Sequence, residues 1–149
     1  MYSVNLIVET VNAGNPAVYT IMLCKHYFMN KTILIVDDSD FVIQMISFTL
    51  EQEGYTTLSG IDGKDALKHF DGKPIDLVIT DLNMPNMDGL HLISNIRLQT
   101  AYQHIPIVLF DSHDADDTEY IKKSGATALL AKEMVHDKLV ATVKQMIGE

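Results

Sequence analysis

The sequence has a single cysteine, Cys24, and few basic residues: 11 Lys and Arg stand against 20 Asp and Glu, a formal net charge of −9. One cysteine excludes a disulfide framework and a zinc site built on cysteines. Only Glu9 and Lys25 are charged in residues 1–30, so the acidic excess lies in the rest of the chain. Acidic surfaces repel phosphate backbones, and we therefore expect no direct binding to DNA or RNA.

Long apolar runs are missing as well. The longest one near the N-terminus, residues 17–24, is too short to cross a bilayer and contains Thr20. No basic residue precedes it and no small-x-small cleavage site follows it, so the sequence predicts neither a membrane span nor a secretory signal. We expect a cytoplasmic protein without membrane contact.

Two common kinds of ligand site are also absent. Neither G-x-x-x-x-G-K nor G-x-G-x-x-G occurs, so the sequence predicts no glycine-rich phosphate loop. The six histidines are scattered, and no two of them stand at the helical spacing of metal ligands. We interpret them as surface residues.

From Lys31 onward, short apolar runs alternate with stretches of helical periodicity. Runs that are apolar on both faces are typical of a parallel sheet covered by helices on each side. Right-handed crossovers then give a doubly wound α/β fold with five parallel strands in the flavodoxin-like order 2-1-3-4-5. We predict one domain over residues 31–149, with strands at 33–36, 55–59, 76–80, 105–110 and 128–131 and helices at 41–53, 63–70, 90–99, 114–124 and 135–147.

Residues 1–30 do not share this alternation. Two β-rich runs, 2–11 and 17–23, flank the turn-forming stretch Asn-Ala-Gly-Asn-Pro and predict a hairpin. Met29 stands directly before the first strand, which favours residues 1–28 as a non-native upstream segment. The alternative is a native extension that pairs with the sheet edge or with another chain.

Acidic residues follow two strands that this strand order makes neighbours. Asp37 and Asp38 end the first strand and Asp81 ends the third, so three carboxylates are predicted in one crevice. Each alone could be a helix cap or a turn residue, but that leaves the repulsion among the three unrelieved. Mg²⁺ with oxygen ligands would relieve it, and Lys132 ends the fifth strand at the same edge. Carboxylates, Mg²⁺ and lysine suit phosphoryl transfer, with an aspartate as acceptor.

Four stretches of this chain resemble the receiver domain of two-component response regulators, most closely the single-domain, CheY-like type. They are ILIVDD at residues 33–38, VITDLNMPNMDGL at 78–90, IPIVLF at 105–110, and Lys132. The segment from Asp81 to Gly89 is highly specific when it follows an acidic pair at this distance. The resemblance covers about residues 31–147.

The resemblance implies a role for each matching residue. Asp81 is the expected phosphoacceptor, which takes a phosphoryl group from a phosphohistidine, and Lys132 is expected to contact that group. Asp38 is expected to bind Mg²⁺, with Asp37 close by or acting through water and with Asp81 and the backbone carbonyl of Asn83 as further ligands. The implied partners are a sensor histidine kinase or phosphotransfer protein and a downstream effector, in a monomer or weak dimer that is not itself an enzyme.

Three positions depart from the family pattern, all on the side of the site that is expected to contact the phosphoryl group and respond to it. Asp111 stands where receivers carry Thr or Ser, and the hydroxyl of Ser112 is one residue late. Leu129 replaces the aromatic switch residue, and Glu133 replaces the proline after Lys132, so the bond before it is expected to be trans. One hypothesis is that Asp111 pairs with Lys132 and holds it away from the phosphoryl site.

These departures leave a second class of function open. The alternative is a pseudo-receiver that works without phosphorylation, purely as a protein-interaction module. A metal-dependent phosphatase is a third hypothesis. The haloacid type of phosphatase is not favoured, because the stretch from Asp81 to Asn83 lacks the second acid of its Asp-x-Asp motif.

Overall fold

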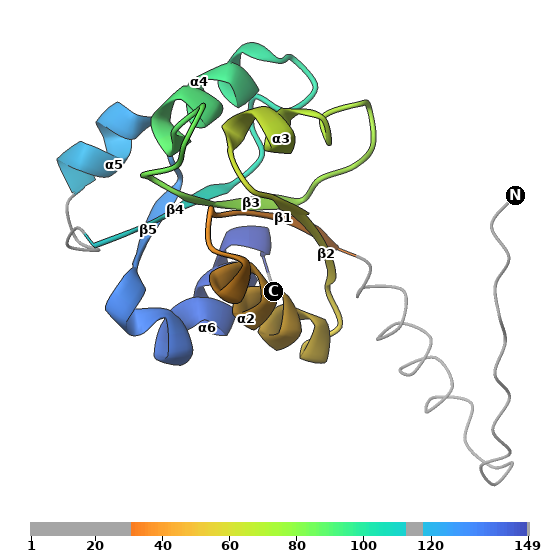
Figure 1. The fold of residues 1–149 in the computed structure, drawn as a ribbon, viewed down its shortest axis with the longest axis vertical. Coiled ribbons are helices and arrows are strands. Elements are labelled where there is room, and N and C mark those ends of the chain that lie inside the picture. Colours follow the sequence, from red (N-terminus) through yellow and green to blue (C-terminus); the bar gives the residue numbers. More distant parts are fainter. Residues whose placement is uncertain (1–30, 113–117, 149) are drawn as a thin grey trace, which may run out of the picture.

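The structure is a computed structural model that describes residues 31–112 and 118–148. Five strands alternate with five α-helices and one 3-10 turn, η1 (Figure 1). In chain order the elements are β1 (Thr32–Val36), α2 (Asp40–Gln52), β2 (Thr56–Gly60), α3 (Gly63–Leu67), β3 (Leu77–Asp81), α4 (Gly89–Leu98), β4 (Ile107–Asp111), α5 (Thr118–Ser124), β5 (Ala128–Ala131), η1 (Lys132–Met134) and α6 (Val135–Ile147).

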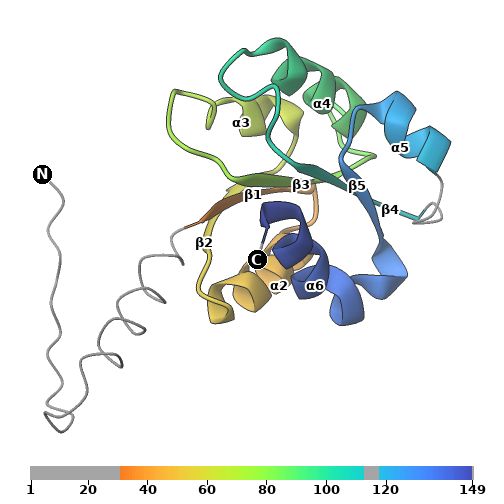
Figure 2. The same ribbon diagram turned by 180° about the vertical axis from the view of Figure 1, so that it is seen from behind.

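The strands form one parallel sheet in the order β2-β1-β3-β4-β5. Helices α2 and α6 cover one face, and α3, α4 and α5 cover the other (Figures 1 and 2). The predicted doubly wound fold and its strand order are therefore confirmed. Among the described residues, no helix has both the length and the apolar character that crossing a bilayer requires.

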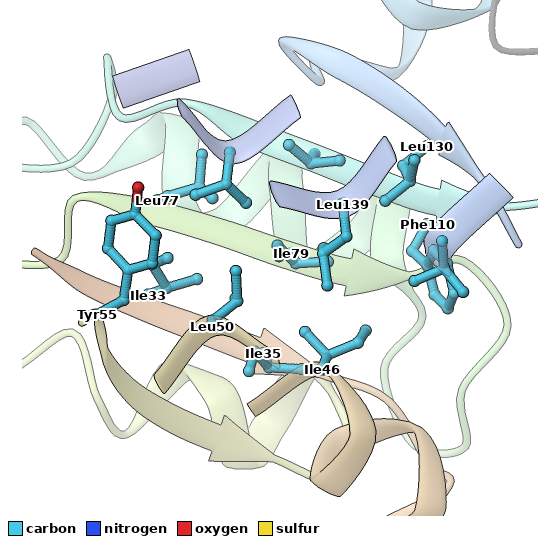
Figure 3. Packing of buried hydrophobic residues seen from close by; sticks show 13 residues of the cluster. Ile33, Ile35, Ile46, Leu50, Tyr55, Leu77, Ile79, Phe110, Leu130 and Leu139 are labelled. Carbon is cyan, nitrogen blue, oxygen red and sulfur yellow. The ribbon is translucent and has the colours of Figure 1, made fainter. Parts of the chain in front are cut away.

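Side chains on each strand alternate between two apolar cores, as the period of two requires. On β1, Ile33 and Ile35 face α2 and α6, whereas Leu34 and Val36 face the other three helices. Figure 3 shows the first of these cores, in which Leu139 of α6 lies over the sheet. Burial on both faces explains why β1 reads as a continuous apolar run.

The element bounds differ from the predicted ones by a few residues. Strand β4 begins at Ile107, two residues later than predicted, and α3 already ends at Leu67. The predicted helix 114–124 is described from Thr118 onward, and its first four residues lie outside the described part of the chain. The predicted hairpin in residues 1–30 lies outside it as well.

Candidate functional site

From the neighbouring strands β1 and β3, the chain continues toward opposite edges of the sheet. Strand β1 connects through α2 to β2, and β3 connects through α4 to β4 on the other face. A crevice opens at such a switch point, outside the carboxyl ends of the strands. Asp81 is the last residue of β3, and Asp37 directly follows β1.

Three carboxylates meet in this crevice. Asp37, Asp38 and Asp81 each offer one oxygen, and these oxygens lie within 4.8 Å of one another. Asp37 and Asp81 are each 3% exposed, while Asp38 is exposed to solvent. The sequence predicted this convergence from strand order, and the structure brings the three residues together.

The backbone holds Asp37 in place. Its amide donates to the carbonyl of Gly60 at 3.2 Å, and its Oδ1 accepts from the amide of Ser39 at 2.8 Å. Ser39 in turn accepts from Val42 and caps α2. The short link between β1 and α2 therefore fixes this carboxylate at the mouth of the crevice.

Oδ2 of Asp37 is buried without a hydrogen-bond partner among the described residues. Burial raises the pKa of the Asp37 carboxyl above its usual value, and the charge of Asp81 raises it further, although the hydrogen bond from Ser39 opposes both. An unpartnered carboxylate oxygen beside two other acids fits a hard divalent cation such as Mg²⁺. Asp37, Asp38 and Asp81 are the residues that would hold it.

Lys132 brings a positive charge to the acidic trio. It directly follows β5, and its Nζ lies 2.6 Å from Oδ1 of Asp81. Burial lowers the pKa of the lysine, but the charges of Asp81, Asp37 and Asp111 outweigh this, so its pKa is raised. The hypothesis that Asp111 holds Lys132 away from Asp81 is wrong, because the ion pair of the lysine is with Asp81.

The loop after Asp81 packs closely on its backbone. A Cβ atom at Gly89 would collide with the carbonyl oxygen of Asp81, so only glycine fits there. The amide of Gly89 donates to the carbonyl of Leu82 at 2.9 Å, and Asp88 caps α4 by accepting from the amide of His91. The Asp-Gly pair of the motif thus starts α4 directly against the end of β3.

Sequence reasoning missed one contact that supports this loop. Asn86 has a positive φ of 60°, and its side-chain amide donates to Oδ2 of Asp62 at 2.6 Å. Asp62 caps α3, and the amide of the following Gly63 donates to the carbonyl of Met87. The sequence shows an acidic residue, Asp62, in a capping position before α3. No pattern along the chain indicated that Asn86 would bind it.

The residues that depart from the family pattern lie on one side of the site. Asp111 is the last residue of β4 and 5% exposed, whereas Ser112 is exposed. Leu129 is buried in the core between the sheet and the helices α3, α4 and α5. Glu133 is exposed in the turn η1, and the described residues contain no cis peptide bond. The predicted backbone carbonyl ligand, Asn83, lies in the loop just after Asp81, and its role stays a prediction.

A trio of carboxylates with a lysine on one of them has the groups that phosphoryl transfer needs. A bound cation and the lysine would neutralise charge on phosphoryl oxygens, and an aspartate can serve as the nucleophile. Residues 33–144 match the model of the response regulator receiver domain. The chain belongs to this family.

Individual relatives agree with this assignment. The receiver is 33% identical over 115 residues to the CAI-1 autoinducer sensor kinase/phosphatase CqsS of Vibrio cholerae, which covers 76% of this chain and 17% of that protein. It is 25% identical over 122 residues to the polar-differentiation response regulator DivK of Brucella ovis, covering 81% of this chain and 99% of the relative. The chain therefore spans a small part of some curated relatives and nearly all of others.

A solved structure gives the same result. The chemotaxis response regulator CheY4 of Vibrio cholerae superposes on this receiver with a TM-score of 0.72 and 31% identity, covering 78% of this chain and 98% of that one. The response regulator TrrA of Thermotoga maritima, solved in complex with Mg²⁺ and BeF, gives a TM-score of 0.67 at 29% identity, over 78% and 98% of the two chains. The CheY-like resemblance drawn from the motifs is confirmed.

Proposed function

We propose that this receiver takes a phosphoryl group from a phosphohistidine onto Asp81, in a reaction that requires Mg²⁺. The contact of Lys132 with Oδ1 of Asp81 carries the proposal. Phosphoryl transfer needs little covalent help from the protein beyond the nucleophile, so positioning and charge neutralisation supply most of the rate. Asp81 lies at the one point where the lysine and the other two acids meet.

The acid trio would serve two tasks. Asp37, Asp38 and Asp81 would hold the cation, with the backbone carbonyl of Asn83 as a further candidate ligand, and Asp81 would also attack the phosphoryl group. When bound, Mg²⁺ would neutralise negative charge on the phosphoryl oxygens and lower the repulsion within the trio. Lys132 would then move from the oxygen of Asp81 to an oxygen of the transferred group.

The partners follow from the family and from the surface charge. We infer a sensor histidine kinase or a phosphotransfer protein as donor and a separate protein as effector, reached in the cytoplasm. The acidic surface disfavours nucleic acid as a direct target. Oligomeric state is expected to be a monomer or a weak dimer, and the domain is expected to serve as a phosphoacceptor rather than as an enzyme acting on other substrates.

Intact-protein mass spectrometry after incubation with acetyl phosphate and Mg²⁺ tests the proposal. Wild-type protein should gain one phosphoryl group, and Asp81→Asn, which keeps the shape of the side chain, should gain none. Omitting Mg²⁺ should abolish the adduct on the wild type. No adduct under conditions in which Mg²⁺ binds would contradict the proposal and favour a pseudo-receiver that acts by protein binding alone.

A further inference from the structure

Two phenylalanines on the outer side of α2 lie open to solvent. Phe41 is 75% exposed and Phe48 is 66% exposed. They are seven residues apart on the helix, which is close to two turns, so they lie on the same side of it. Both belong to a shallow groove, here called the α2 stripe, which is lined by Phe41, Gln44, Met45, Ser47, Phe48 and Glu51.

The fold of the described residues does not account for the two exposed rings. The core uses the opposite side of α2, where Ile46 and Leu50 are buried against the sheet. A single exposed apolar residue is ordinary, but two large ones on one side of a helix form a patch. Such patches mark surfaces that another segment or another molecule covers.

The α2 stripe faces the open edge of the sheet. Oε1 of Glu51, at the C-terminal end of the stripe, accepts a 2.5 Å hydrogen bond from Oγ1 of Thr57. Thr57 lies on β2, which is an edge strand and has β1 as its one neighbour in the described sheet. The stripe therefore borders a side of the domain on which a further segment has room to lie.

Residues 1–30 join the domain next to this stripe. The described part of the chain starts at Lys31, and its carbonyl accepts from the amide of Thr56 at 2.9 Å. The amide of the preceding Tyr55 donates to the carbonyl of Leu50 in the last turns of α2. Lys31 and the C-terminal end of α2 thus adjoin the same short link into β2, and a segment that leads into Lys31 arrives beside the stripe.

The run nearest to this junction has the composition of a buried segment. Nine of the twelve residues from 17 to 28 are apolar, and the one charged residue among them, Lys25, is basic. Fully extended, twelve residues span up to about 40 Å, whereas the thirteen residues of α2 are about 20 Å long. The run is therefore long enough to cover the stripe from end to end.

We propose that residues 17–28 of this chain dock on the α2 stripe and bury Phe41 and Phe48. A tethered segment has a high effective concentration at a site beside its attachment point, so a modest apolar contact keeps it bound. A second copy of the chain has no tether and brings a formal net charge of −9 to a surface of the same sign. The segment itself brings a positive charge, which the acidic surface attracts.

The docked segment also borders the acid crevice. Phe41 follows Asp38 by three residues, so the N-terminal end of the stripe lies beside the mouth of the site. A protein donor then meets a surface that the segment partly occupies, whereas acetyl phosphate is small enough to pass it. This consequence rests on the proposed function, but the docking does not, and its test involves no phosphorylation.

The single cysteine of the chain, Cys24, lies within the proposed docking run and carries a spin label for the first test. In the full-length protein, we expect the label to broaden the amide NMR signals of α2 most strongly, and reduction of the label to restore them. Signals of α2 that stay sharp would overturn the proposal. Equal broadening in a mixture of spin-labelled protein and separately isotope-labelled, label-free protein would show docking on a second copy and overturn it as well.

Hydrogen exchange of residues 17–28 in the unlabelled full-length protein gives a second readout. Phe41→Ser and Phe48→Ser change exposed side chains, so the domain stays folded, and each should speed this exchange about 10-fold or more, because burial of one phenylalanine shifts an equilibrium by that much. The control is Leu98→Ser on α4, which removes an even more exposed apolar side chain and should leave the exchange unchanged. Equal exchange of residues 17–28 in all four proteins would overturn the docking and leave Asp81 as the proposed acceptor.

Discussion

The side-chain amide of Asn86 donates a 2.6 Å hydrogen bond to the carboxylate of Asp62, and so ties the loop after the acceptor strand to the start of α3. The two residues are 24 positions apart and come from different loops at the same edge of the sheet. The bond holds Asn86 in a left-handed conformation that asparagine tolerates better than most residues.

Two substitutions at Asn86 separate the hydrogen bond from the backbone conformation. Asn86→Gly loses the bond to Asp62 but keeps the positive φ at no steric cost, whereas Asn86→Ala loses the bond and also strains the backbone. We therefore expect both to be less stable than the wild type, with Asn86→Ala lower than Asn86→Gly by about 1 kcal/mol. Urea unfolding measures this difference, and equal stability of the two variants would contradict it.

Asp37→Asn should stabilise the metal-free domain at neutral pH. In the folded state burial, and then the charge of Asp81, raise the pKa of Asp37, so ionisation of this carboxyl opposes folding. The protonated form carries no such penalty. The penalty is therefore absent below the unfolded pKa of 3.8 and develops as pH rises through the higher folded pKa.

Urea unfolding in EDTA at pH 7 should show Asp37→Asn more stable than the wild type by about 1 kcal/mol, and the gain should shrink as pH falls toward 4. Asparagine keeps the oxygen that accepts from the amide of Ser39, so the cap of α2 is not disturbed. The control is Asp40→Asn, which removes an exposed acid nearby and should change stability by less than about 0.5 kcal/mol. A gain that did not depend on pH would count against the electrostatic explanation.

Removing the positive charge of Lys132 should have opposite effects on metal and phosphoryl binding. Lys132→Met keeps most of the side-chain length but leaves the acid trio without its internal cation, so Mg²⁺ should bind several-fold more tightly. The same variant should lose most of its phosphoryl adduct with acetyl phosphate, because the contact with Asp81 is gone. Isothermal titration calorimetry gives the first result and mass spectrometry the second; weaker Mg²⁺ binding would show that Lys132 organises the trio.

Gly89→Ala should destabilise the contact between the start of α4 and the end of β3. The added Cβ would meet the carbonyl oxygen of Asp81, which the sheet holds in place, so α4 or its preceding loop has to shift. Overpacking of this kind costs about 1–3 kcal/mol. Gly72→Ala is the matched control, since it has a positive φ of 94° and open space around it, and its cost should stay near 1 kcal/mol. Thermal unfolding compares the two.

Most of the fold could be predicted because β1, β3 and β4 are buried on both faces and are therefore apolar over most of their length. The start of β4 was placed too early because Ile105 and Pro106 are apolar yet precede the first paired residue, Ile107. Apolar character alone does not separate a strand from the loop that leads into it.

The convergence of Asp37, Asp38 and Asp81 followed from strand order, but the partner of Lys132 did not. Strand neighbours suggested Asp111, because β4 and β5 are adjacent. A lysine side chain is long enough to cross one strand, and which carboxylate it selects depends on side-chain geometry that the register does not contain. The bond between Asn86 and Asp62 was invisible for the same reason, since it joins two loops.

The hydrogen bonds that fix the crevice also determine how it can respond to charge. The backbones of Asp37 and Asp81 are held by Gly60 and by the sheet, so these two acids cannot separate to relieve their repulsion. Lys132 relieves it in part at Asp81, and further relief has to come from outside, as added positive charge. The proposed Mg²⁺ would then be a folding ligand as well as a cofactor: by linkage, each tenfold excess of free cation over its dissociation constant would add about 1.4 kcal/mol to the stability of the receiver. In a cell, the supply of magnesium would set how firmly this domain is folded before any kinase reaches it.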